Sequence, residues 1–141
     1  MSFPNPVVAT VSWLWSLPGI TTAFPTLTIT AKRSNAGSRK YAIVPKMSGG
    51  TASRDVPLTK PRIDLKFYGP TEHDVARLYE WVYPHIFPIL ERLGNGFLSE
   101  GCRVTHIWHE GGPIELVDDD DGVTPVIVVV LRYQMAAKVY A

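Results

Sequence analysis

The chain has 141 residues, of which 45% are hydrophobic and 19% charged, so it holds enough apolar material for the core of one domain and is not a disordered tail or linker. The formal net charge of +1 is the sum of two unlike halves. Residues 1–66 hold nine Lys/Arg and two Asp/Glu, a net charge of +7, while residues 67–141 hold five Lys/Arg and eleven Asp/Glu, a net charge of −6. This division argues against uniform binding of a polyanion, and the single cysteine, Cys102, excludes an internal disulfide and a cysteine-based zinc site within one chain.

The amino-terminal residues predict a short helix. Asn5 is a favourable N-cap, Pro6 suits the first helical position, and apolar residues follow at helical spacing to about Ser16. No basic residue precedes Lys32, and no apolar run approaches the roughly 18 residues of a membrane helix. We therefore expect a soluble protein without a secretory signal or a membrane partner.

Three strands are predicted next, with a long loop before the third. Residues 24–31 and 39–45 have the composition and alternation of strands. Residues 47–61 contain adjacent glycines and lack periodicity, which predicts a mobile loop. Apolar and charged residues then alternate over 62–67, predicting a strand with one buried and one charged face.

The main helix is predicted to begin at Thr71, because Thr71 and Asp74 form a pattern typical of a capping box. Apolar residues then recur every three or four positions and form one continuous stripe that can lie on a sheet. Pro84 and Pro88 each remove an amide donor, so we expect a kink near Pro84 or two helical pieces.

The carboxyl-terminal part predicts further strands. Residues 103–109 and 114–117 each have a strand pattern, and 125–135 is a run of Val, Ile and Leu that indicates a central strand covered on both faces. We therefore predict a single α+β domain over residues 1–141, in which one mixed or antiparallel β-sheet packs with a long kinked helix and a short amino-terminal helix.

The sequence contains no arrangement typical of catalysis. His106 and His109 are three apart on a predicted strand, so they point to opposite faces and cannot share a metal ion. Residues 118–121 with Gly122 resemble a calcium loop, but the register lacks the essential first and last carboxylates. An acidic hairpin turn is favoured there, and weak divalent-ion binding is left open. We predict no catalytic residues, no cofactor and no metal site, and hence a protein that is not an enzyme.

The basic residues of the first half are the candidate binding surface. They are consistent with a small nucleic-acid-binding module, or with a solvated sheet face or an oligomer contact. Only Tyr41 and Phe67 lie among them as aromatic residues that could stack on bases, so we favour the second interpretation.

One segment and the order of elements resemble a known family. Residues 62–71 read R-I-D-L-K-F-Y-G-P-T and lead directly into the helix E-H-D-V-A-R-L-Y-E-W-V. This transition, and the layout of most of the chain, is similar to the tail terminator proteins of long-tailed bacteriophages. The resemblance implies a small α+β protein that forms a homo-hexameric ring, terminates the tail tube and joins it to the head-completion proteins of the neck, while genomic DNA passes through the lumen. It implies no catalytic residue, and it places the protein in the virion after synthesis in the host cytoplasm.

A ring needs a contact in which two different surfaces of neighbouring copies meet, and the division of charge predicts basic residues facing acidic ones across it. The candidates for this subunit interface are Arg33, Arg39, Lys40, Arg62, Asp118, Asp119 and Asp120. The candidates for docking onto the tail tube protein or the neck through the predicted loop are Ser48, Gly49, Gly50 and Arg54. A head-closure or other neck connector protein is the alternative within the same class.

Overall fold

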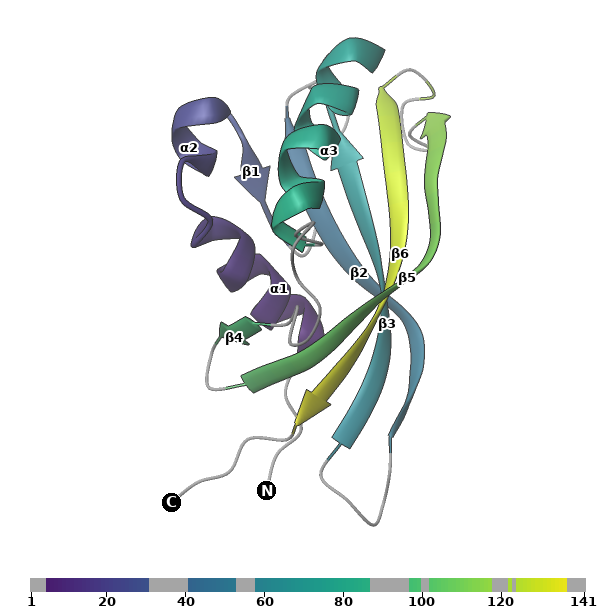
Figure 1. Cartoon of the computed structure of the whole chain (residues 1–141). Helices are drawn as coiled ribbons and strands as arrows, with labels where there is room; N and C mark the ends of the chain where they lie inside the picture. The colour runs from purple at the N-terminus through teal and green to yellow at the C-terminus, as the bar shows by residue number, and fades with distance from the viewer. Residues whose placement is uncertain are drawn as a thin grey trace.

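The structure is a computed structural model that describes residues 5–30, 41–52, 58–86, 97–99, 102–117, 122 and 124–136. Within these residues the chain forms an α+β fold with one mixed sheet, as predicted, and three helices, of which the short helix at residues 20–23 was not predicted (Figure 1). The helices are α1 (Pro6–Trp15), α2 (Ile20–Ala23) and α3 (Glu72–Ile86). The strands are β1 (Thr28–Ile29), β2 (Ala42–Ala52), β3 (Leu58–Tyr68), β4 (Phe97–Ser99), β5 (Cys102–Val117) and β6 (Pro125–Ala136).

The six strands of the described residues lie in the order β1-β2-β3-β6-β5-β4. All neighbouring pairs are antiparallel except β1 and β2, so the sheet is mixed. β6 lies between β3 and β5, which confirms the prediction of a central strand at the carboxyl-terminal end. β5 joins the two predicted strands at 103–109 and 114–117 into one.

The three helices pack on one face of the sheet, and the main core lies between them and the strands (Figure 1). The alternation predicted for β3 is confirmed: Ile63, Leu65 and Phe67 are fully buried in this core. Arg62, Asp64 and their alternating neighbours point to the other face. Burying each large apolar side chain contributes roughly 1.5–3 kcal/mol, so this core is the main source of stability.

Asn5 caps α1 as predicted: its side-chain oxygen accepts hydrogen bonds from the amides of Val7 (3.0 Å) and Val8 (3.2 Å). Within the helix, the buried Thr10 hydroxyl donates to the Pro6 carbonyl at 2.7 Å. The Thr10 hydrogen is thereby used, so the Tyr133 hydroxyl, 2.9 Å away, donates to the Thr10 oxygen. This buried contact joins α1 to β6, and burial raises the pKa of the Tyr133 hydroxyl.

We predict that Tyr133→Phe lowers the free energy of unfolding by about 0.5–1.5 kcal/mol, because it removes a buried hydrogen bond and keeps the ring. Urea unfolding measures the loss. Tyr83→Phe is the matched control, since the Tyr83 hydroxyl lies in an exposed contact 3.2 Å from His109, and its effect should stay within about 0.5 kcal/mol. Equal losses in the two variants would contradict the assignment.

α3 begins at the predicted capping box. The Thr71 hydroxyl accepts from the Asp74 amide (3.2 Å) and donates to the Asp74 carboxylate (2.9 Å). The Tyr41 hydroxyl donates to the other carboxylate oxygen at 3.1 Å. The hydrogen bond from Thr71 is the main cause that lowers the pKa of Asp74, which keeps a negative charge at the positive end of the helix.

The turn between β3 and α3 depends on a glycine. Gly69 is buried, and a Cβ atom added there would lie 2.7 Å from the Val75 amide nitrogen and 2.9 Å from its Cα atom. Backbone atoms of a helix cannot shift as the end of a side chain can, so any larger residue would push α3 away from the sheet.

We predict that Gly69→Ala lowers the free energy of unfolding by about 1–3 kcal/mol through overpacking. Gly111→Ala is the control, because its Cβ atom would meet the Val130 side chain at an ordinary 3.6 Å, and its effect should remain within about 1 kcal/mol. Denaturant unfolding of both variants checks this, and an unchanged stability of Gly69→Ala would contradict the close packing.

Two predictions need revision. α3 is continuous through Pro84 to Ile86, so the kink is not confirmed, and Pro88 lies outside the described residues. Pro84 has no amide hydrogen to donate to the Glu80 carbonyl, so the helix lacks one backbone hydrogen bond there.

The prediction of a loop over residues 47–61 is wrong for residues 47–52 and 58–61, because these residues belong to β2 and β3, which pair as antiparallel strands. Residues 53–57 lie outside the described residues. Gly49 and Gly50 pair with β3 beyond a register shift at Met47. Glycines that favour a loop locally are thus held in a strand by cross-strand pairing.

Candidate interaction surface

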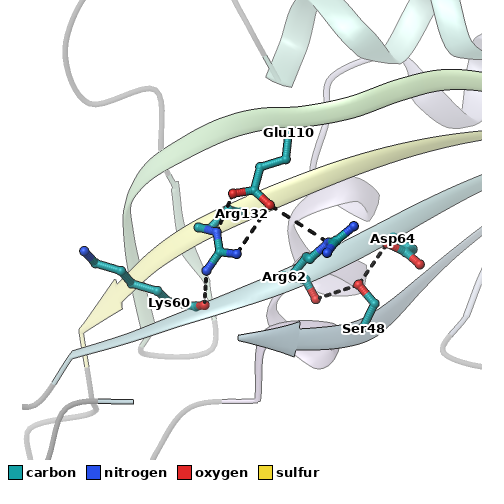
Figure 2. A network of polar contacts seen from close by, with 6 residues as sticks. All are labelled: Ser48, Lys60, Arg62, Asp64, Glu110 and Arg132. Atoms are coloured by element: carbon teal, nitrogen blue, oxygen red, sulfur yellow. Dashed lines mark hydrogen bonds and ion pairs between the residues drawn. The ribbon is translucent and has the colours of Figure 1, made fainter. Parts of the chain in front are cut away.

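The face of the sheet away from the helices, here called the open face, has two zones. The apolar zone is a small buried cluster of Ala42, Val44, Tyr68, Val126 and Val128. The charged zone contains the six residues drawn in Figure 2: Ser48, Lys60, Arg62, Asp64, Glu110 and Arg132. These six side chains come from four strands, β2, β3, β5 and β6, so the zone exists only when the sheet has formed.

The charged zone is built around two arginines that share one carboxylate. Arg62 on β3 and Arg132 on β6 are direct cross-strand partners, and like charges in that position repel. Glu110 on β5 offsets this repulsion: it accepts hydrogen bonds from Nε and Nη2 of Arg132, and its carboxylate lies 3.9 Å from Nε of Arg62 (Figure 2). A bidentate guanidinium–carboxylate pair fixes the orientation of both groups.

Three further contacts extend the network along β3 and to Ser48 of β2 (Figure 2). The Lys60 carbonyl accepts a hydrogen bond from Arg132 at 3.5 Å. The Ser48 hydroxyl donates to the Asp64 carboxylate at 2.9 Å and lies 3.4 Å from the Arg62 carbonyl. Each acidic group of the zone thus has a partner within the chain.

Irregular pairing in β5 places Glu110. The register between β5 and β6 shifts between His109 and Gly111 and again before Ile114, so Glu110 is an extra residue opposite β6. Gly112 has φ +81°, and a Cβ atom there would lie 2.4 Å from the Val128 carbonyl oxygen, so only glycine fits. The His109 ring donates from Nε2 to the Gly112 carbonyl at 2.7 Å and holds this bend.

Glu110 is ionised more readily than an ordinary glutamate. The hydrogen bond from Arg132 is the main cause that lowers its pKa, and the charges of Arg132 and Arg62 act in the same direction. Because the pKa is lower in the folded than in the unfolded chain, the ionised carboxylate stabilises the fold above about pH 4.3, the usual value for glutamate. This contribution is lost as the pH falls through the lowered pKa of the folded state.

We predict that Arg132→Met raises the pKa of Glu110 more than Arg62→Met does, because Arg132 donates directly and Arg62 lies 3.9 Å away. An NMR titration of the Glu110 carboxyl measures both. In parallel, the stability difference between the wild type and Glu110→Gln should be present at pH 7 and disappear in strong acid. Equal pKa values in the two arginine variants would show that the bidentate pair is not formed in solution.

The structure brings together only part of the predicted site. Arg62 and Ser48 lie in the charged zone, and Gly49 and Gly50 lie in β2 and not in a loop. The remaining candidates lie outside the described residues: Arg33, Arg39, Lys40, Arg54, Asp118, Asp119 and Asp120. Arg62, from the basic half, already contacts Glu110 of the acidic half within one chain, and its contact with a neighbouring copy stays a prediction.

The prediction that His106 and His109 lie on opposite faces is confirmed. The Tyr83 hydroxyl of α3 lies 3.2 Å from the His109 ring, whereas His106 packs against Trp108 at a ring distance of 4.8 Å and pairs across the sheet with Gln134. Among the described residues, no group of three or more His, Cys, Asp or Glu could hold a metal ion.

Sequence reasoning did not identify Arg132 and Glu110 as partners. Arg132 stands out as a charged residue near the end of an apolar strand, and Glu110 precedes a Gly-Gly-Pro sequence typical of a bend. These signals mark each residue separately. Their pairing depends on the register of strands far apart in the sequence.

The sequence was compared with family models and with curated proteins. No family model matches the chain, and no curated protein matches it either. In the part of the chain that the structure describes, no helix has the length and apolar character needed to cross a membrane.

Proposed function

We propose that this protein is a structural virion protein that forms a ring at the end of a phage tail tube and joins it to the neck, with DNA passing through the lumen. The observation that carries the proposal is the segment on which the family resemblance rests. β3 ends at Tyr68, Gly69 packs directly against Val75, and Thr71 caps α3. The residues that resemble the family are therefore those that fix the position of the main helix on the sheet.

The open face supports a role in protein contact. Its described side chains include five cations, and Arg62 and Arg132 both face Glu110. Part of the positive charge of this surface is thus neutralised within the chain. Such a surface suits a partner that carries both positive and negative groups, such as another protein, better than a uniform polyanion.

Electron microscopy and light scattering of the purified chain test the proposal. We expect closed rings with a pore and a mass that is a whole multiple of 15.7 kDa; six copies would match the resemblance. A monomer at every concentration tested, or an assembly without a pore, would contradict the proposal.

A head-closure or other neck connector is separated from a tail terminator by the phenotype of particles that lack the protein. A terminator predicts overlong tail tubes, because polymerisation of the tube no longer stops. Tails of normal length that fail to join heads would indicate a connector.

The nucleic-acid-binding alternative is favoured by one observation: the cations of the open face outnumber its acids. These residues are Lys46, Lys60, Arg62, Lys66 and Arg132 against Asp64 and Glu110. Binding of the monomer to DNA, measured between 50 and 200 mM salt, decides between the two. The ring predicts weak binding, and tight binding with a steep salt dependence would support the alternative.

A further inference from the structure

The two outer long strands each present an edge. β1 pairs with β2 only at Ala42 and Ile43, and β4 pairs with β5 only at residues 102–104. Among the described residues, no strand therefore lies beside the outer side of β2 over 44–52 or of β5 over 110–117. An open strand edge is a template for pairing with another chain.

Exposed apolar side chains collect on these same two strands. Seven large hydrophobic residues are exposed among the described residues, and five of them lie on β2 or β5. These five are Met47, Trp108, Ile114, Leu116 and Val117. Four of the five lie on β5, and such a concentration indicates a contact, whereas Met47 is the one exposed residue of this kind described on β2.

The charges of the two edges favour pairing between unlike edges. Along the unpaired segments, the described β2 side chains include the exposed Lys46 and no acid. Residues 110–117 of β5 include the exposed Glu115 and Glu110, which pairs with Arg132, and no lysine or arginine; Arg103 of β5 lies opposite β4. Two β2 edges would repel each other, and so would two β5 edges, whereas β2 and β5 attract.

The direction of the strands also fits. β2, β3, β6 and β5 alternate in direction, so a second copy in the same orientation would place its β2 antiparallel to β5 of the first. On the helix side, Met47 would then lie on the same face as Glu115 and Val117 of the neighbour. Those two residues line a cavity of about 220 Å³ between β5, β6 and the start of α3, into which an exposed side chain such as Met47 can project.

We infer that the partner of these edges is a second copy of this chain: β2 of one copy pairs with β5 of the next, so that the sheets continue from copy to copy. This inference rests on the proposed function and names the contact that builds the ring. In this contact the main chains of two defined strand segments form hydrogen bonds, in place of a general attraction between the basic and acidic halves of neighbouring copies. A contact between different edges repeats head to tail, as a ring requires.

Amide hydrogen exchange tests the contact without knowledge of its register. The exchange of the assembled protein is compared with that of the same protein diluted to monomers. We expect new protection at residues 44–52 and 110–117. Protection elsewhere, with both segments unchanged, would overturn the inference.

Charge variants at the edges test the same contact by assembly. Met47→Glu places an acid opposite the acidic edge, and Val117→Lys places a cation opposite the basic edge; the two residues are similarly exposed, at 55% and 57%. Each is expected to raise the concentration needed for assembly about tenfold or more, and the double variant should recover part of the loss because the new charges attract.

Val8→Glu and Val8→Lys are the matched controls, since Val8 is 48% exposed and lies on α1 and on neither edge strand. They should assemble like the wild type, and circular dichroism checks that every variant folds. Rings that form normally from all variants would overturn the edge contact and leave the proposed function standing. A wild-type protein that stays monomeric would overturn the proposed function itself.

Discussion

The packing of the described helices on a single face of the sheet is the constraint on which the rest of the structure depends. One face must supply the large apolar side chains, and β3 does so with Ile63, Leu65 and Phe67. The other face has no helix among the described residues to cover it. β6 is apolar on both sides: alternate residues enter the main core, while Val126 and Val128 on the open face are buried in the small cluster that includes Tyr68 of β3. Polar residues then occupy what remains of the open face.

The same one-sided packing makes the charged zone necessary. The register that buries the apolar residues also sets Arg62 directly opposite Arg132, and none of the described helices lies on that side to supply a counter-charge. The carboxylate comes instead from Glu110, an extra residue in the neighbouring strand. The basic and acidic halves of the sequence thus come together within one sheet, because β3 from the first half lies next to β6 from the second. Part of the difference in charge between the halves is therefore neutralised inside the sheet.

Local patterns predicted a large part of this fold. The cap at Asn5, the capping box at Thr71, the alternation in β3 and the central β6 each depend on residues close in sequence, and all are confirmed. The extension of β2 through Gly49 and Gly50 was missed, because glycine pairs favour loops until a partner strand holds them. The charged zone was missed for a related reason. Its residues come from four strands, and the register between distant strands is decided by packing and not by short-range pattern.

The two irregularities that surround Gly111 in β5 have a consequence for how this strand tolerates change. Each adds one residue relative to β6, so together they restore the alternation, and Trp108 and Leu116 face the same side. Loss of one extra residue between His109 and Ile114 would remove one irregularity and leave Glu115 and Leu116 opposite Ile127 and Val126, their partners in β6. Both side chains would keep their present faces, and the strand would lose part of its bend. This segment can therefore lose either extra residue without reversing its surfaces, whereas a slip of its pairing with β6 by one residue would reverse both surfaces of the strand end.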